Sequence, residues 1–418
     1  MPLPPMTRRA ALRLSAAAVL RAAGGLGAAG GLAAAGGLAA CTPSPAPGPT
    51  RSSGPAPSSS GGSSGSAASG GTAAGSTASG GTASGGTGAG GAAPSSAPRV
   101  TGTIAEGLRT PWSIAFAPDG MAFVSERDTG RILRLAGDGG APREAGKVTA
   151  RKGTREGGLL GLEVSPTFAK DGLLYAYYTA AGANRVVTLT WDGTSLGGER
   201  IIVDGIPAAV VHNGGRLRFG PDGLLYIGTG DANTRTLSPD LGSLGGKILR
   251  VTPDGSPAPG NPHGTRVYTW GHRNVQGLAW DSRGRLWASE FGPERNDELN
   301  LIVAGGDYGW PAVTGGARSG SSVPAAFVWP STANASPSGL VVVGDVAYVA
   351  CLRGQRLWRF PLPGPGYVPD GSGSLPGATE HFRNEYGRLR DAVAVPGRNE
   401  LWLATNADAG SRILRVEL

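Results

Sequence analysis

The sequence predicts an all-β protein whose folded region, residues 99–418, is a six-bladed β-propeller of four-stranded antiparallel blades. Three observations lead to this fold class. Turn signals of the Pro-Asp-Gly type recur six times between residues 118 and 398, about 56 residues apart. A short alternating apolar run follows each turn, and a second motif, Gly-Arg-Ile-Leu-Arg-Leu in its first copy, recurs as well. Multi-strand repeats of roughly 40–60 residues are typical of propellers.

The elements follow in chain order. The turns occupy residues 118–120, 170–172, 221–223, 282–284, 343–345 and 396–398. The runs after them alternate with a period of two, which indicates strands rather than helices. These runs span residues 122–126, 173–177, 224–228, 285–290, 346–350 and 400–404, and the second motif adds strands at 130–135, 246–251, 355–360 and 411–416. We expect residues 100–105 to complete the last blade, since the ring would otherwise keep an exposed sheet edge.

Residues 1–98 are predicted to lie outside the propeller. In residues 1–40, Arg8 and Arg9 precede a weakly apolar stretch, as in a twin-arginine export signal. The small residues before Cys41 resemble a bacterial lipoprotein processing site, so we expect Cys41 to carry a lipid; a chance cysteine in an Ala-rich leader is the alternative. Residues 42–98 contain only Thr, Pro, Ser, Ala and Gly besides Arg51. Residues 41–98 are therefore expected to form a lipidated, flexible linker.

Charge and cysteine content narrow the function classes. Five of the arginines behind the formal net charge of +8 lie in residues 1–98, which contain no Asp or Glu, so the folded region carries only +3. This balance removes most of the support for nucleic-acid binding. With Cys41 lipidated, Cys351 has no intramolecular partner, and its apolar neighbours favour a buried core residue over a reactive thiol.

Three loop segments are more polar than a blade requires. The first holds His212, ahead of a strand that ends near Asp231. A lone loop histidine is more often a surface residue, but a carboxylate that can orient it makes it a candidate base. The second segment is residues 271–278, and the alternative to a functional role is that it is only a polar turn between blades. The third, residues 290–300 with 306–311, is rich in oxygen-bearing side chains, which suit a hard cation such as Ca²⁺, although its spacing matches no EF-hand.

These segments resemble the signature blocks of the soluble quinoprotein glucose/sorbosone dehydrogenase family. The similar blocks are residues 212–217, 271–278, 292–298 with 308–311, 110–112 with 126–127, 156–162 and 388–391. They follow in order and together cover essentially residues 105–418. The resemblance implies a six-bladed propeller that carries pyrroloquinoline quinone (PQQ).

The resemblance also implies roles in catalysis. His212 would be the general base that takes the proton of a sugar's anomeric hydroxyl while hydride passes from the same carbon to the quinone. Asp231 would hold the His212 ring and stabilise the imidazolium that forms. Arg273 would stabilise the negative charge that develops on the quinone, and Asn274 and Gln276 would be neighbouring cofactor-site residues.

Further residues would bind the carboxylates of the cofactor. Arg388 and Arg390 fall where the family contacts these groups, and guanidinium groups bind carboxylates bidentately. Arg353 stands where relatives often have Lys, so the charge is kept while the geometry differs.

Two Ca²⁺ sites are implied by the same resemblance. The carbonyls of Gly292 and Pro293 resemble ligands of a Ca²⁺ that also binds the cofactor. Glu298 and the carbonyl of Tyr308 resemble a second, structural Ca²⁺ site.

The leading hypothesis is an exported dehydrogenase, lipid-anchored to the outer face of the cytoplasmic membrane, that uses PQQ and Ca²⁺ to oxidise the anomeric C1 of aldose sugars to lactones. The reduced cofactor must pass its electrons to an acceptor, whose identity the sequence leaves open. One alternative is a non-catalytic propeller that binds cell-wall sugar or a protein partner, since fold alone does not settle function. A metal-dependent lactonase is another, but it needs several carboxylates around one channel ion, whereas these loops are rich in Arg and Asn.

Overall fold

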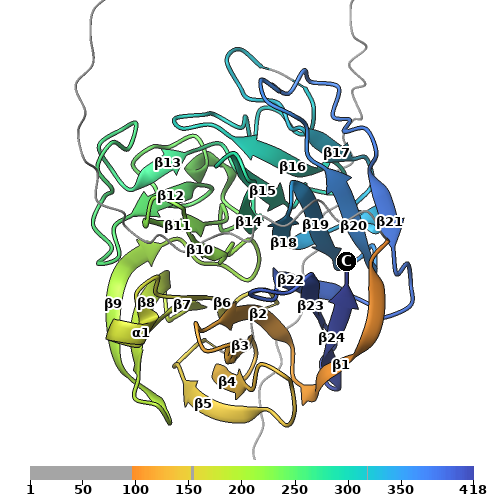
Figure 1. Cartoon of the computed structure of the whole chain (residues 1–418). Helices are drawn as coiled ribbons and strands as arrows, with labels where there is room; N and C mark the ends of the chain where they lie inside the picture. The colour runs from red at the N-terminus through yellow and green to blue at the C-terminus, as the bar shows by residue number, and fades with distance from the viewer. Residues whose placement is uncertain (1–96, 152–154, 318) are drawn as a thin grey trace, which may run out of the picture. The chain divides into compact units, whose positions relative to one another are not determined.

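A computed structural model describes residues 97–151, 155–317 and 319–418. Over these residues the chain forms six four-stranded sheets, which follow one another around a ring (Figure 1). The predicted six-bladed β-propeller is confirmed. The predicted signal segment 1–40, the lipidated Cys41 and nearly all of the linker 41–98 lie outside the described residues.

The first three blades contain these strands, in the order in which they pair: β2 (Pro111–Phe116), β3 (Ala122–Glu126), β4 (Arg131–Leu135) and β5 (Arg143–Lys147); β6 (Leu159–Val164), β7 (Leu173–Thr179), β8 (Asn184–Trp191) and β9 (Leu196–Ile206); β10 (Leu217–Phe219), β11 (Leu225–Gly228), β12 (Ile248–Val251) and β13 (Val267–Thr269). Each strand pairs antiparallel with the next in its blade.

The last three blades repeat the pattern: β14 (Val275–Trp280), β15 (Leu286–Glu290), β16 (Asp297–Ile302) and β17 (Phe327–Trp329); β18 (Pro337–Val343), β19 (Val346–Cys351), β20 (Arg356–Pro361) and β21 (Thr379–His381); β22 (Leu389–Ala394), β23 (Glu400–Thr405), β24 (Ser411–Glu417) and β1 (Arg99–Leu108). The alternating runs of the sequence are thus the second strand of every blade. The Gly-Arg-Ile-Leu-Arg-Leu motif is the third strand of four of them.

The ring closes through its two ends. The N-terminal strand β1 pairs antiparallel with β24, with Arg99 opposite Glu417, as expected for residues 100–105. The first strands of neighbouring blades also pack around the whole ring, β2 on β6, β6 on β10, β10 on β14, β14 on β18, β18 on β22 and β22 on β2. These six inner strands line the central channel, so the residues at their ends converge on one axis.

The core is divided into six hydrophobic clusters, one between each pair of adjacent blades. This arrangement follows from the strand patterns, because both faces of an interior blade pack against another sheet. Cys351 is buried in one cluster, and burial raises the pKa of its thiol well above the usual value. The expectation of a core cysteine is confirmed.

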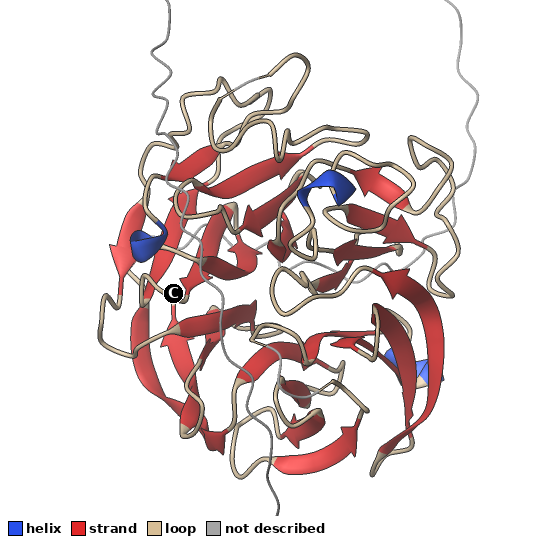
Figure 2. Cartoon of the chain, turned by 180° about the vertical axis from the view of Figure 1, so that it is seen from behind, coloured by secondary structure: helices blue, strands red, loops and turns tan. Residues whose placement is uncertain are grey.

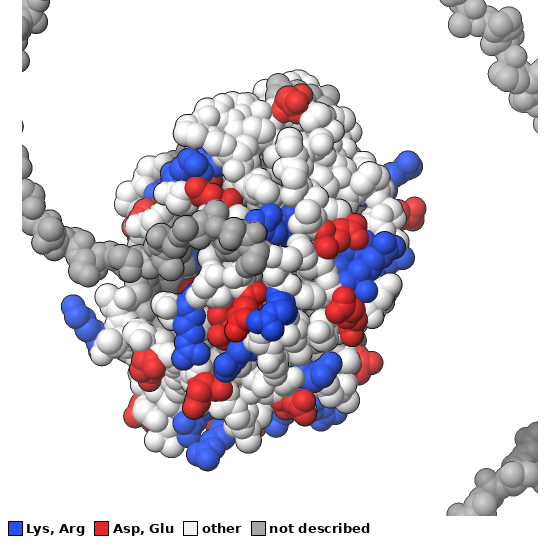
Figure 3. Space-filling view, turned by 45° about the vertical axis from the view of Figure 1, so that its right-hand side comes forward, with Lys and Arg blue, Asp and Glu red and all other residues white. Residues whose placement is uncertain are grey.

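Helices contribute little to this part of the chain (Figure 2). The described residues contain α1 (Phe168–Asp171) and two 3₁₀ turns, Arg235–Leu237 and Thr332–Asn334. None of the helices among them has the length and apolarity needed to cross a bilayer. On the face shown in Figure 3, acidic and basic side chains are interspersed rather than gathered into one basic patch.

Candidate active site

Eight predicted site residues line a cavity of about 410 Å³ at one end of the channel: His212, Arg273, Gln276, Gly292, Pro293, Arg353, Arg388 and Arg390. Two kinds of segment supply the wall, the segment that enters the first strand of a blade and the segment that joins its second and third strands. Because successive strands are antiparallel, both kinds lie at the same end of the blade. All six blades contribute. The volume falls within the roughly 300–1,000 Å³ of small-molecule sites.

His212 is held in an unusual backbone conformation. Its φ is 59°, in the left-handed region that few residues with a β-carbon adopt. Its N–H donates to Oε2 of Glu156 at 2.8 Å, and its carbonyl accepts from the N–H of Ala232 at 3.1 Å. A Cβ at Gly230 would lie 2.0 Å from the His212 carbonyl oxygen, so only glycine permits this approach. A strained residue fixed by several contacts is a feature of functional sites.

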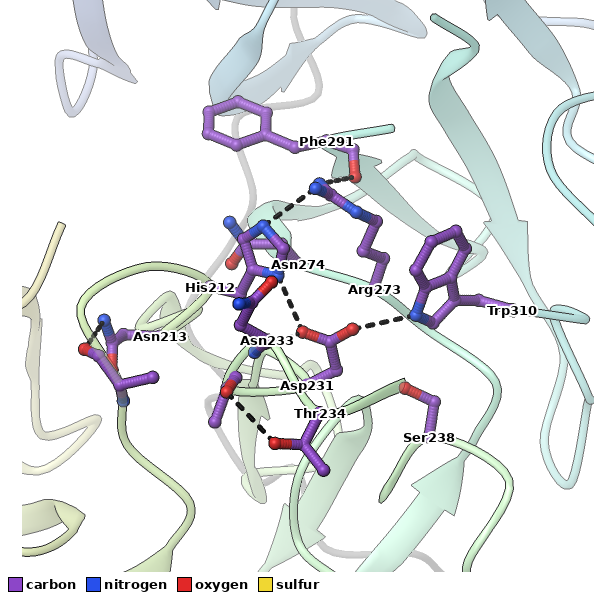
Figure 4. A network of polar contacts seen from close by, with 12 residues as sticks. His212, Asn213, Asp231, Asn233, Thr234, Ser238, Arg273, Asn274, Phe291 and Trp310 are labelled. Atoms are coloured by element: carbon purple, nitrogen blue, oxygen red, sulfur yellow. Dashed lines mark hydrogen bonds and ion pairs between the residues drawn. The ribbon is translucent and has the colours of Figure 1, made fainter. Parts of the chain in front are cut away.

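The His212 ring lies between a carboxylate and a guanidinium (Figure 4). Its Nδ1 lies 2.7 Å from Oδ1 of Asp231, a residue that is 0% exposed. Asp231 also accepts from the Asn233 N–H and from Nε1 of Trp310, each at 2.8 Å. On the far side of the ring, Nη2 of Arg273 lies 2.8 Å from Nε2. Because a carboxylate only accepts and a guanidinium only donates, Nδ1 carries the proton, and the electron pair of Nε2 accepts from Arg273.

Arg273 connects this ring to the loop after β15. Its Nη1 donates to the carbonyl of Phe291 at 3.0 Å and to that of Gly292 at 2.7 Å, and its backbone N–H donates to Glu290. Its buried Nε finds no partner among the described residues. Burial lowers the pKa of Arg273, while nearby carboxylates, Asp231 foremost, act in the opposite direction. Arg273 is therefore a fixed cation in contact with the electron pair of His212 Nε2.

The cavity is strongly cationic. Its charged lining consists of Arg127, Arg155, Arg273, Arg353, Arg388 and Arg390 against Glu156 and Asp297. The buried Arg390 donates from Nη1 to Gln276 and Ser338, each at 3.3 Å, while its Nε has no partner among the described residues. Burial, followed by the neighbouring guanidinium groups of Arg127 and Arg388, lowers the pKa of Arg390 to about 9. Crowded cations with a spare buried donor favour a ligand with several negative charges.

Four predicted residues lie behind the cavity wall rather than on it: Asp231, Asn274, Glu298 and Tyr308. Asn274 is fully buried, and its Oδ1 accepts from the Gly214 N–H at 2.9 Å and from Nε2 of Gln276 at 3.1 Å. The structure therefore places Asn274 as a support for the segment that carries His212 and for the Gln276 side chain.

The predicted calcium ligands fall in two neighbouring places. Gly292 and the exposed Pro293 line both the main cavity and a small adjacent cavity, whereas Glu298 and Tyr308 line the small cavity alone. No group of three or more His, Cys, Asp or Glu side chains is placed to hold a metal in residues 97–151, 155–317 and 319–418. Carbonyl and amide oxygens would therefore have to complete either site.

The small cavity has a donor set that suits Ca²⁺. Nδ2 of Asn300 donates to Glu290 at 3.4 Å and to Glu298 at 3.1 Å, whereas its buried Oδ1 has no partner among the described residues. Burial and the neighbouring Glu290 carboxylate raise the pKa of Glu298 to about 8. Two adjacent carboxylates, Glu290 and Glu298, in the wall of one small cavity fit a hard cation that takes oxygen ligands.

Several residues have positions in the site that the sequence analysis did not assign, among them Arg127, Arg155, Glu156 and Trp310. Arg127, Glu156 and Trp310 lie within the blocks that resemble the family, so the sequence could have indicated a role for them. Arg155 is exposed and precedes its block, and nothing in the sequence separates it from other surface arginines.

Comparison with known proteins identifies similar chains. The sequence model of the glucose/sorbosone dehydrogenases matches residues 108–415. The PQQ-bound structure of an aldose sugar dehydrogenase from Streptomyces coelicolor is 44% identical, with a TM-score of 0.72 over 77% of this chain and 98% of that one. Quinoprotein glucose dehydrogenase B from Acinetobacter calcoaceticus is 32% identical over 249 residues, which are 51% of this chain and 52% of that protein.

The aldose sugar dehydrogenase YliI of Escherichia coli is 32% identical over 239 residues, 52% of this chain and 64% of that protein. The chain thus spans between half and two thirds of the length of these curated relatives.

Proposed function

The chain belongs to the glucose/sorbosone dehydrogenase family, and we propose that it oxidises the anomeric C1 of aldose sugars to lactones with PQQ and Ca²⁺. One observation carries this proposal most directly. A histidine whose Nδ1 is fixed by a buried carboxylate has its unprotonated Nε2 at a cavity lined by six arginines. When bound, PQQ supplies the two-electron acceptor that none of the amino-acid side chains provides.

The residues of the chain supply the acid–base chemistry and the positioning. His212 takes the proton of the C1 hydroxyl at Nε2, and Asp231, 2.7 Å from Nδ1, stabilises the resulting imidazolium. Arg273, which already faces Nε2, supplies positive charge where negative charge develops.

The cationic wall supports binding of PQQ itself. Three carboxylates on the ligand match an excess of guanidinium groups, and Arg390 has a buried Nε that still lacks a partner among the described residues. The positions of Arg388 and Arg390, one at the mouth and one buried in β22, suit a ligand that reaches from the opening toward the channel. Arg353, exposed and bonded to Thr332 at 3.0 Å, would make a weaker contact at the rim.

Calcium would occupy both oxygen-rich places. At the main cavity the Gly292 carbonyl, with that of Pro293, would hold the ion that also contacts the cofactor. In the adjacent cavity Glu298 and the Tyr308 carbonyl would hold a structural ion, with Glu290 in the same wall.

For location, we propose export and lipid anchoring to the outer face of the cytoplasmic membrane. The support comes from Arg8 and Arg9, from Cys41 after small residues, and from the linker composition of residues 42–98. A Gly-rich coil of this length has a mean reach on the order of 40 Å, enough to keep the domain near the membrane.

The test is reconstitution of the purified protein with PQQ and Ca²⁺, followed by dye reduction with a panel of aldoses. We expect sugar-dependent reduction that needs both additions and is lost in His212→Ala. Sugar binding without reduction in the reconstituted protein would instead support the non-catalytic propeller. The lactonase alternative is disfavoured by a cavity with six arginines and two carboxylates, and it predicts hydrolysis of added lactones without PQQ.

A further inference from the structure

Trp310 connects the fourth blade to the carboxylate of the third. Its Nε1 donates to Oδ2 of Asp231 at 2.8 Å, while Oδ1 of the same carboxylate faces the His212 ring (Figure 4). The two partners are 79 residues apart in sequence and both are buried, with Trp310 7% exposed and Asp231 0%. The indole N–H therefore lies directly behind the group that orients the candidate base.

The loop of Trp310 is anchored independently of this bond. The Trp310 N–H donates to the Gly271 carbonyl at 2.9 Å, and the Tyr308 N–H donates to that of Trp270, also at 2.9 Å. Oδ1 of Asp307 accepts from the Gly309 N–H at 2.8 Å and fixes the turn before Trp310. The indole thus reaches Asp231 from a backbone that is already held in place.

Two guanidinium groups flank the Trp310 ring. The Arg235 guanidinium lies 5.2 Å from the ring centroid and that of Arg273 lies 5.5 Å from it. The charged groups around the His212 ring are thus Asp231 and Arg273 in direct contact, Glu156 through the His212 backbone, and Arg235 across the indole. Trp310 thus contacts both cations through its ring and donates to the buried carboxylate of Asp231.

We propose that Trp310 is a positioning residue for the dehydrogenase reaction: its indole N–H locks the Asp231 carboxylate in the rotamer that holds the Nδ1 proton of His212. A buried carboxylate with donors on both oxygens has one preferred orientation, whereas loss of the donor on Oδ2 leaves only the two donors on Oδ1 to resist rotation about the Cβ–Cγ bond. The role in turnover rests on the proposed function. The effect on the Nδ1 proton does not.

The experiment compares Trp310→Phe with Trp287→Phe in the full chain. Trp287 is the matched control. It is fully buried in the same blade and its Nε1 donates to a carboxylate away from the site, that of Asp281, at 3.0 Å. Nitrogen-resolved NMR on protein without added PQQ measures exchange of the His212 Nδ1 proton with water, assigned by its absence in His212→Asn. We expect about tenfold faster exchange in Trp310→Phe, equivalent to one hydrogen bond to a charged group, and less than about twofold change in Trp287→Phe.

Turnover is a second, independent measurement. In protein loaded with PQQ and Ca²⁺, Trp310→Phe should lower kcat about tenfold while KM for the sugar and the Kd of PQQ stay within about twofold. Unchanged exchange and unchanged kcat in Trp310→Phe would overturn the proposal, because phenylalanine has no ring N–H to donate. If that variant does not fold, benzothienylalanine at position 310, which has the shape of tryptophan without the N–H, tests the same bond. Faster exchange in a protein that oxidises no sugar would confirm the positioning and refute the proposed function.

Discussion

Nη2 of Arg273 lies 2.8 Å from Nε2 of His212, so the guanidinium that is placed to stabilise negative charge also faces the electron pair that is placed to take a proton. The contact fixes which ring nitrogen is free, since a guanidinium cannot accept. It also places one cation within reach of the carbonyl oxygens of Phe291 and Gly292. The expected effects of substitutions follow from these shared contacts.

Replacing the base should abolish turnover and leave binding intact. His212→Asn is the informative variant, because asparagine tolerates the left-handed φ of 59° yet cannot take a proton. We expect kcat to fall by about 10²–10⁴, the usual contribution of a general base. The Kd of PQQ, measured by fluorescence titration, should stay within about twofold; loss of binding would mean that His212 mainly holds the cofactor.

The buried and the rim arginines should differ in their effect on PQQ binding. Arg390→Met removes a buried guanidinium with a spare donor, and we expect the Kd of PQQ to rise about 10- to 100-fold. Arg353→Met removes the same charge from an exposed position and should raise the Kd by less than about fivefold. Equal effects of the two variants would show that only the net charge of the cavity matters.

Arg273 and Ca²⁺ should compete for the Gly292 carbonyl. The oxygen that is the proposed ligand accepts from Nη1 of Arg273 at 2.7 Å, so removal of the guanidinium leaves it free. In calorimetric titrations without PQQ, Arg273→Ala should bind Ca²⁺ at this site more tightly than the wild type. Arg353→Ala, which removes an equal charge from the same cavity without touching Gly292, should change the affinity less. The reverse order would place the ion elsewhere.

The loop that follows Asp231 should depend on one buried lysine. Nζ of Lys247 donates to the carbonyls of Leu237 and Gly245 at 2.7 Å each and to that of Ser238 at 2.9 Å. Lys247→Met leaves these oxygens without the donor and should lower the free energy of unfolding by about 3 kcal/mol in urea titrations.

The same substitution has a predictable pH dependence. Burial lowers the pKa of Lys247 from 10.5 to about 8, so between these pH values the unfolded chain binds more protons at this residue than the folded protein does. The contribution of Lys247 to the free energy of unfolding therefore rises with pH over this interval. The difference between wild type and Lys247→Met should widen from pH 8 to 10.5, and a difference that narrows would contradict the lowered pKa.

The fold was predictable because each blade repeats the same local signal. The turn at 118–120 and the run at 122–126, for example, indicate the position of a hairpin and of a strand from neighbouring residues alone. The site was predictable only in part. Glu156 and His212 stand 56 residues apart, about one repeat, and contact each other because neighbouring blades present equivalent segments at the same end.

Other contacts depend on the angle at which separate segments meet. Trp310 reaches Asp231 from the loop after β16, and no periodicity of the sequence relates the two residues. The burial of Asn274 is a second example. Its side chain lies behind the cavity wall because it accepts from the Gly214 N–H, and that contact depends on the path of a separate segment.

The most direct test of the account is single-turnover reduction of bound PQQ by an aldose, compared with the same sugar deuterated at C1. We predict one lactone per bound cofactor, slower reduction with the deuterated sugar, and reduction slowed by about 10²–10⁴ in His212→Asn that still binds PQQ and Ca²⁺. Reduction that is insensitive to deuterium at C1 and unaffected by His212→Asn would contradict the proposed chemistry, because neither the C1 hydride nor the histidine would then take part.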